Sequence, residues 1–137
     1  MNSIRGFSAE ADEAEGVLIV DDDVQVLRFV ARMLNSLGFR NVFQAASPEE
    51  AQDIWASYRS DIGLLITDFV MPTQTGDLMA QHMRKANSGL RILFISGNDP
   101  LCLDSAIPLQ PGINFLQKPF TMADMRKSID CLTQCAA

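Results

Sequence analysis

Oxygen-bearing side chains and a lysine follow four of the apolar runs in this sequence, each at the point where a run ends. The pair Asp21-Asp22 follows the first run, Asp68 the third, Ser96 the fourth and Lys118 the fifth. Carboxylates that lie close together repel one another, and one is forced to stay protonated unless a cation neutralises the group. No histidine or cysteine accompanies them, and ligands that are all hard oxygens suit Mg²⁺, or Mn²⁺ in its place. If these residues meet in the fold, the pattern indicates a divalent-cation site.

A carboxylate beside such a cation can do chemistry on phosphorus. The aspartate would attack as a nucleophile and form an acyl phosphate, while the lysine and the hydroxyl would stabilise the charge of the phosphoryl group. Taken singly, an aspartate after a strand can merely cap the next helix, Ser96-Gly97 can form a turn, and Lys118 can be a surface lysine. Their joint occurrence in this order, each after an apolar run, favours the functional interpretation.

Five short apolar runs are predicted to be β-strands. They are rich in Val, Ile, Leu and Phe and show little alternation with polar residues, which is typical of strands that are buried on both faces. The runs occupy residues 17–20, 41–45, 62–67, 91–95 and 113–117.

Segments of helical character lie between these runs. The predicted helices cover about residues 24–37, a segment that opens at Ser47-Pro48, about 75–86 and about 122–132. In the third of them, Leu78, Met79 and Met83 are expected to face the core.

Strand–helix alternation with short connections predicts a parallel sheet that is covered by helices on both faces. Right-handed crossovers leave few topologies, and five strands suit the flavodoxin-like, doubly wound (βα)5 α/β fold with strand order 2-1-3-4-5. Ligands of such a sheet bind just beyond the carboxyl ends of the strands, which is where the candidate residues lie. The fourth helix should be short or irregular, because Pro100, Pro108 and Pro111 leave only about 101–107 free to be helical.

The bulk composition restricts the class of protein. The chain has 137 residues, of which 47% are apolar and 20% charged, as expected of one globular domain. Residues 1–15 show no apolar period and are expected to be a flexible leader, with the domain at 16–135. The net charge of −6 argues against direct binding of nucleic acid.

The apolar runs and the cysteines indicate where such a protein would be found. No apolar run approaches the roughly 20 residues that are needed to span a bilayer, so no membrane insertion is expected. The three cysteines are odd in number and show no metal-ligand spacing. Reduced thiols in a cytoplasmic protein are therefore the preferred interpretation.

Four motifs of this sequence together resemble those of the receiver domain of two-component response regulators. They are VLIVDDD, LLITDFVMP followed by TG, ILFISG and FLQKPF, in that order over about residues 16–135. The proline-rich stretch PLQPGINFLQKPF is more similar to the receivers of hybrid sensor histidine kinases than to common stand-alone receivers.

The resemblance implies a phosphorylation site with a metal ion. Asp68 corresponds to the phosphoacceptor. Asp22 and Asp68 would bind magnesium directly and Asp21 mainly through water. The backbone carbonyl of Val70 would complete the ligands that the protein supplies.

The resemblance also implies a switch. Ser96 corresponds to the hydroxyl that turns toward the phosphoryl group, and Lys118 would pair with that group. Pro119 would hold the loop that carries Lys118. A cis peptide bond between the two residues is one way in which it could hold this loop. Phe115 matches the aromatic switch position, whose ring goes inward when the hydroxyl moves, although phenylalanine lacks the hydroxyl of a tyrosine.

A regulatory phosphoacceptor, rather than an enzyme, is the function that the resemblance implies. A histidine kinase or a histidine phosphotransfer protein would phosphorylate Asp68, and a change of conformation would signal to a protein partner. A single-domain regulator is favoured over a module excised from a hybrid histidine kinase, because a short leader with its own Met1 precedes the domain.

Two other functions are less well supported by the sequence. The run Asp21-Asp22-Asp23 also resembles the opening motif of haloacid-dehalogenase-like phosphatases, in which Asp21 would be the nucleophile. That family needs further acids after its lysine, and it would leave the motif around Asp68 unexplained. A pseudo-receiver that only binds partners would normally have lost an acid or the lysine, and all of them are present here.

Overall fold

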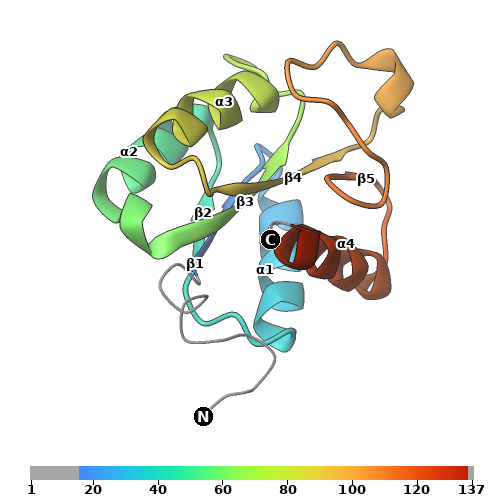
Figure 1. The fold of residues 1–137 in the computed structure, drawn as a ribbon, viewed down its shortest axis with the longest axis horizontal. Coiled ribbons are helices and arrows are strands. Elements are labelled where there is room, and N and C mark those ends of the chain that lie inside the picture. Colours follow the sequence, from blue (N-terminus) through green and yellow to red (C-terminus); the bar gives the residue numbers. More distant parts are fainter. Residues whose placement is uncertain (1–15, 136–137) are drawn as a thin grey trace.

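The computed structural model describes residues 16–135, in which strands and helices alternate (Figure 1). The strands are β1 (Gly16–Val20), β2 (Val42–Ala45), β3 (Ile62–Asp68), β4 (Arg91–Ser96) and β5 (Phe115–Gln117). The α-helices are α1 (Val24–Ser36), α2 (Pro48–Tyr58), α3 (Gly76–Ala86) and α4 (Met122–Cys135). Two 3₁₀ turns are η2 (Arg59–Asp61) and η3 (Pro100–Cys102).

The five strands form one parallel sheet in the order β2-β1-β3-β4-β5, which confirms the predicted topology. Strands β1 and β3 are neighbours, and every residue of both is buried. Because parallel strands end at the same edge of a sheet, the residues that follow β1 and those that end β3 are brought together.

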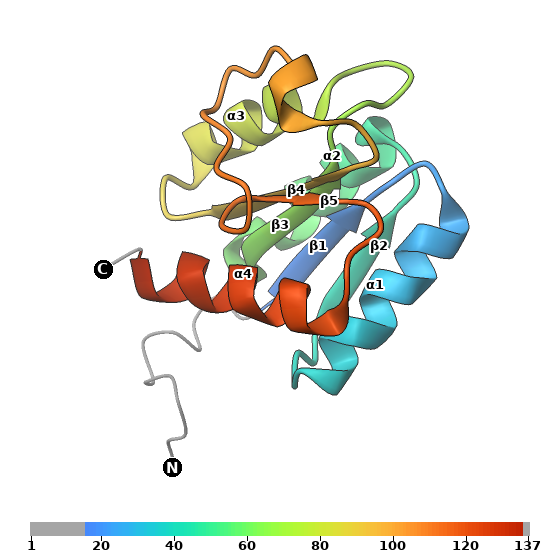
Figure 2. The same ribbon diagram turned by 90° about the vertical axis from the view of Figure 1, so that its right-hand side faces the viewer.

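Helices cover both faces of the sheet (Figure 2). On one face, Trp55 of α2 and Met79 of α3 pack in the same core as the strand residues. On the other face, Leu34 of α1 and Met125 of α4 belong to a second core. The two cores explain why β1 and β3 carry almost no polar residues: neither face of these strands meets water.

Two helix starts follow from short polar side chains. Asp23 caps α1, since its carboxylate accepts a hydrogen bond from the backbone N of Gln25 at 2.9 Å. Ser47 caps α2 in the same way, through the backbone N of Glu50 at 3.1 Å. The third acid of the run 21–23 thus has the ordinary role of a helix cap.

The connection between β4 and β5 departs most from the expected elements. In place of a helix over about 101–107 there is one 3₁₀ turn, η3, and β5 begins at Phe115 instead of residue 113. Asp99 starts the turn by accepting a hydrogen bond from the backbone N of Leu101 at 2.9 Å. The turn ends at Leu103, whose backbone is extended, with φ −108° and ψ 135°.

Apolar side chains of this connection cover the sheet where a helix was expected. Ile107 is buried, and Leu103 and Leu109 pack against the same core as α2 and α3. An irregular segment can therefore replace a helix, because three well-placed apolar side chains keep water from the strands.

The prediction for the inner face of α3 was wrong at one residue. Met79 and Met83 are fully buried, but Leu78 is half exposed. Consecutive helical residues point about 100° apart, so Leu78 and Met79 cannot both lie at the centre of the buried face.

The described part of the chain contains no helix of the length and hydrophobicity that a bilayer crossing requires. The leader expected at residues 1–15 lies outside the described residues.

Gly76, the first residue of α3, lies against the end of β3. A Cβ atom added there would lie 2.3 Å from the backbone oxygen of Asp68 and 3.1 Å from Oγ1 of Thr67. We predict that Gly76→Ala lowers the free energy of unfolding by about 1–3 kcal/mol, the usual result of overpacking, as measured by urea denaturation. Gly97→Ala is the matched control, because a Cβ atom there meets nothing within 4 Å. Equal stability of the two variants would contradict the close packing of α3.

Candidate functional site

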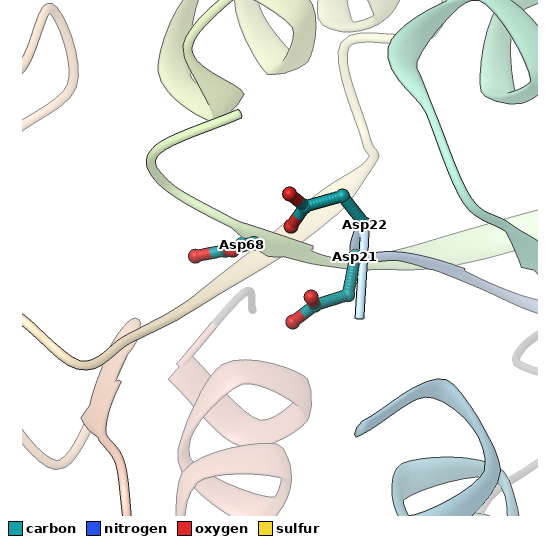
Figure 3. Close-up of side chains that lie close together, drawn as sticks. All are labelled: Asp21, Asp22 and Asp68. Carbon is teal, nitrogen blue, oxygen red and sulfur yellow. The ribbon is translucent and has the colours of Figure 1, made fainter. Parts of the chain in front are cut away.

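Three carboxylates meet where β1 and β3 end. Asp68 is the last residue of β3, and Asp21 and Asp22 follow β1 directly. One oxygen of each lies within 4.8 Å of the others, and their side chains project to the same side of the strand ends (Figure 3). Asp21 and Asp68 are buried, whereas Asp22 is exposed.

Asp21 is held on both of its oxygens. Its Oδ1 accepts a hydrogen bond from the backbone N of Asp23 at 2.8 Å, and its Oδ2 accepts one from Nζ of Lys118 at 3.0 Å. The side chain has almost no contact with solvent. Both bonds orient this carboxylate, and its ion pair with Lys118 offsets part of its desolvation.

Lys118 brings the only cation that is found within salt-bridge distance of these acids in residues 16–135. Its Nζ lies 3.8 Å from Oδ2 of Asp68 as well as 3.0 Å from Asp21. Lys118 follows β5 directly, and its backbone N donates to the oxygen of Ser96 at 2.7 Å. Its peptide bond to Pro119 is cis. One ammonium group thus faces two of the three carboxylates.

The crowding changes the acidity of the two buried acids. Burial raises the pKa of Asp21, and its bonds to Asp23 and Lys118 oppose that rise only in part. Burial, and next the charge of Asp21, raise the pKa of Asp68 from 3.8 to about 6, against the opposing charge of Lys118. The site therefore carries more negative charge than its own lysine neutralises.

The donor set fits a small divalent cation. All three acids offer hard carboxylate oxygens that already lie close enough to share one ion, and no histidine or thiol is part of the group. Ligands of this kind suit Mg²⁺ or Mn²⁺. The raised pKa values of Asp21 and Asp68 agree with a cation site. A bound cation would stabilise the charged form of both acids.

Two further residues of the predicted switch are buried in the neighbouring strands β4 and β5. Ser96 ends β4 and is almost fully buried, and its Oγ accepts a hydrogen bond from the backbone N of Asn98 at 3.1 Å. Phe115 begins β5, pairs with Phe94 and has its ring inside the core. The ring is therefore inward in this structure. The switch roles of both residues stay predictions.

Val70 lies in the loop between β3 and α3, two positions after Asp68, and its side chain is half exposed. This loop follows Asp68 directly. The role of the Val70 backbone carbonyl as a metal ligand stays a prediction. The assignment of Pro119 to the positioning of Lys118 likewise stays a prediction, although the two are joined by the cis bond described above.

Sequence reasoning did not assign a role to two residues that support Asp68. The hydroxyl of Thr67 donates a hydrogen bond to the backbone oxygen of Asp68 at 2.8 Å, and Gly76 donates from its backbone N to the oxygen of Phe69 at 2.7 Å. Together these bonds fix the backbone on both sides of the Asp68 carbonyl. A threonine inside an apolar strand and a glycine at a helix start were the only signals for this support.

The family model of the response regulator receiver domain matches residues 17–130 of the chain. Its span contains both central strands, the three acids, Ser96 and Lys118.

Two similar proteins differ in how much of their length this chain covers. The chain is 28% identical to the sensor kinase CckA of Brucella abortus over 82% of this chain, and it spans only 12% of the length of CckA. It is 30% identical to the probable chemotaxis protein CheY of Rhizobium etli, over 85% of this chain and 90% of that protein. Among solved structures, a response regulator receiver protein from Sinorhizobium medicae matches with a TM-score of 0.78 at 25% identity, over 91% of this chain and 98% of that one.

The raised pKa of Asp68 has a consequence for stability without metal. The folded chain holds this proton up to about pH 6, whereas the ordinary pKa is 3.8. The free energy of unfolding should therefore fall as the pH rises from about 4 to about 6, and it should stay lowered at neutral pH. We predict that Asp68→Asn removes this penalty and raises the free energy of unfolding at pH 7 by about 1–3 kcal/mol, as measured by urea denaturation in the presence of a chelator.

Asp53→Asn is the matched control, because Asp53 is an exposed aspartate in α2. It should leave the stability and its pH dependence close to those of the wild type. A lower stability of Asp68→Asn at pH 7 would show that the Asp68 carboxylate stabilises the fold and would contradict the electrostatic account.

Proposed function

The chain belongs to the response regulator receiver domain family, and from this premise we propose that it is a phosphoacceptor switch of a two-component system. It takes a phosphoryl group from a phosphohistidine, on a histidine kinase or a histidine phosphotransfer protein, onto Asp68. The observation that carries the proposal is the position of the Asp68 carboxylate, which lies beside two other acids and 3.8 Å from the ammonium group of Lys118.

The geometry favours Asp68 over Asp21 as the nucleophile. Both oxygens of Asp21 already accept hydrogen bonds, and its side chain is 1% exposed. The side chain of Asp68 keeps 11% of its surface open to solvent, and it stands at the end of the central strand. A phosphodonor can therefore approach Asp68 more easily, while Asp21 serves to hold Lys118.

The transfer step forms one bond to phosphorus and breaks another. A carboxylate oxygen of Asp68 attacks the phosphorus atom in line, the P–O bond forms, and the P–N bond to the donor's imidazole breaks. Lys118 would pair with a phosphoryl oxygen, which its distance of 3.8 Å from Oδ2 of Asp68 supports, and the hydroxyl of Ser96, the last residue of β4, would bond to the same group. Magnesium, bound by Asp21, Asp22, Asp68 and the carbonyl of Val70, would neutralise charge on the acids and on the phosphoryl oxygens.

Phosphorylation is proposed to act on a two-state equilibrium. The Ser96 hydroxyl, which accepts a hydrogen bond from Asn98 N in the structure, turns toward the phosphoryl group. Phe115, whose ring is buried in the structure, would be the aromatic residue of this switch, and Pro119 would hold the loop of Lys118. The new contacts favour one of the two conformations, which a protein partner then recognises.

The proposed protein is a regulator, not an enzyme with a substrate of its own, and it would work in the cytoplasm. The match to CheY of Rhizobium etli over 90% of that protein supports a single-domain regulator. The match to a 12% portion of the sensor kinase CckA supports the alternative, a receiver module of a hybrid kinase. The downstream partner would be a protein in either case.

The proposal predicts that acetyl phosphate with Mg²⁺ labels the wild-type chain with one phosphoryl group and that Asp68→Asn takes no label above background. The reason is that the amide of asparagine cannot form an acyl phosphate. Intact-mass spectrometry measures the label, and trapping of the acyl phosphate followed by peptide mapping locates it.

Two controls make the labelling test specific. Asp53→Asn should label like the wild type, because Asp53 lies exposed on α2, and a chelator of divalent cations should abolish the labelling. Label on a residue other than Asp68 would disprove the assignment. Sustained hydrolysis of p-nitrophenyl phosphate, instead of stoichiometric labelling, would identify a phosphatase and overturn the proposed function.

A further inference from the structure

Thr67 carries the one hydroxyl in β3, a strand that is otherwise apolar up to Asp68. Its side chain is fully buried, with 0% exposed. Valine has nearly the same shape and suits a strand that is covered on both faces, so packing alone does not require the hydroxyl. A buried hydroxyl is unfavourable unless it makes a hydrogen bond. The partner of the Thr67 hydroxyl therefore indicates what this residue is for.

That partner is the residue proposed to accept the phosphoryl group. Oγ1 of Thr67 donates to the backbone oxygen of Asp68 at 2.8 Å, in a buried hydrogen bond. Gly76 closes the same place from the side of α3, because a Cβ atom there would lie 2.3 Å from the Asp68 oxygen and 3.1 Å from Oγ1 of Thr67. The Asp68 carbonyl is thus held between a hydroxyl and a helix start, where water cannot readily replace the lost bond.

The backbone that follows Asp68 is fixed over two peptide units. The backbone N of Phe69 donates to the oxygen of Ile95 at 3.1 Å, and the oxygen of Phe69 accepts from the N of Gly76 at 2.7 Å. A peptide unit is planar, so it is fixed once its oxygen and its N–H are bonded. The first unit, from the carbonyl of Asp68 to the N of Phe69, is held at both ends. The second, which begins at the carbonyl of Phe69, is held at its oxygen.

These two units lie between two of the proposed metal ligands. The carboxylate of Asp68 leaves the chain directly before the first unit, and the carbonyl of Val70 belongs to the unit directly after the second. A ligand whose backbone is already fixed loses less conformational freedom when it binds. Loss of a hydrogen bond that orients the ligands of a metal ion weakens binding of the ion, typically by about 10- to 100-fold.

We infer that Thr67 is a positioning residue, whose hydroxyl presets the Asp68 carboxylate and the Val70 carbonyl for the divalent cation. The inference rests on the proposed function, in which both of these residues bind the cation. The hydroxyl of Thr67 donates to the backbone of Asp68, so it acts through that backbone and touches no reacting atom. Without this bond, the first peptide unit is held at one end only, and both ligands must be ordered when the ion binds.

Two substitutions separate the hydrogen bond of Thr67 from its packing. Thr67→Val keeps the shape and removes the hydroxyl, whereas Thr67→Ser keeps the hydroxyl and removes the methyl group that packs near Gly76. The full chain is titrated with Mn²⁺ alone, and electron paramagnetic resonance counts the free ion. Thr67→Val should bind Mn²⁺ about 10-fold more weakly than the wild type, the lower end of the usual effect. Thr67→Ser should bind it like the wild type.

Ser128→Ala is the matched control, because it removes another fully buried hydroxyl that donates to a backbone oxygen. Ser128 lies in α4, and its Oγ donates to the oxygen of Gly112 at 2.9 Å. In urea denaturation with a chelator, this variant should be less stable than the wild type, because the Gly112 oxygen loses its partner. Its affinity for Mn²⁺ should stay unchanged. Equal weakening of Mn²⁺ binding in Ser128→Ala and Thr67→Val would show that affinity merely follows stability, and it would overturn the positioning role.

A second pair of variants keeps the test decisive if circular dichroism shows that Thr67→Val is unfolded. Thr67→Ser and Thr67→Ala both lack the methyl group, and they differ from each other in the hydroxyl alone. Thr67→Ala should therefore bind Mn²⁺ about 10-fold more weakly than Thr67→Ser. Equal affinities of these two variants would contradict the inference.

The outcomes distinguish the positioning role from the function on which it rests. Label on Asp68 of the wild type, with equal Mn²⁺ affinities of the wild type and Thr67→Val, would overturn the positioning role and leave the phosphoacceptor function intact. Weaker Mn²⁺ binding by Thr67→Val but not by Thr67→Ser, without label on Asp68 of the wild type, would support the positioning of the cation ligands and overturn the function. The same pattern of binding together with label on Asp68 would support both.

Discussion

The ammonium group of Lys118 stands between Asp21 and Asp68, and the site depends on this arrangement. This single positive charge pairs with two of the three carboxylates, whose nearest ligand oxygens lie within 4.8 Å of one another. Burial, and next the charge of Asp21, raise the pKa of Asp68 to about 6. The fold thus holds its acids at a loss of stability, which a bound cation would relieve. Binding and stability are opposed at this edge of the sheet.

The parallel sheet makes this crowding possible. Strand β1 is hydrogen-bonded to β3, and β3 to β4, so three strand ends lie side by side. Both faces of the inner strands are covered, and their apolar side chains anchor the ends firmly. Thr67 and Gly76 then fix the backbone around Asp68 through their own hydrogen bonds and close packing. A rigid frame therefore surrounds a cluster of charges that repel one another.

The connection between β4 and β5, by contrast, is irregular. Three prolines and a single 3₁₀ turn leave it with few backbone hydrogen bonds. It is kept in place by apolar side chains and by the bond from Ala106 to Asp77. The rigid strand ends and the loosely held connection are joined at Ser96.

The sequence alone determined the sheet and its order, because strands that are buried on both faces must be apolar throughout, and that pattern is visible without coordinates. It also determined which residues meet at the carboxyl edge, since the end of a parallel strand has a fixed place. Only the tertiary structure decided which carboxylate Lys118 binds most closely. It also decided that Leu78 is half exposed and that Asp77 accepts a hydrogen bond from the backbone N of Ala106. These contacts join elements distant in the chain, and their geometry depends on packing that no local pattern encodes.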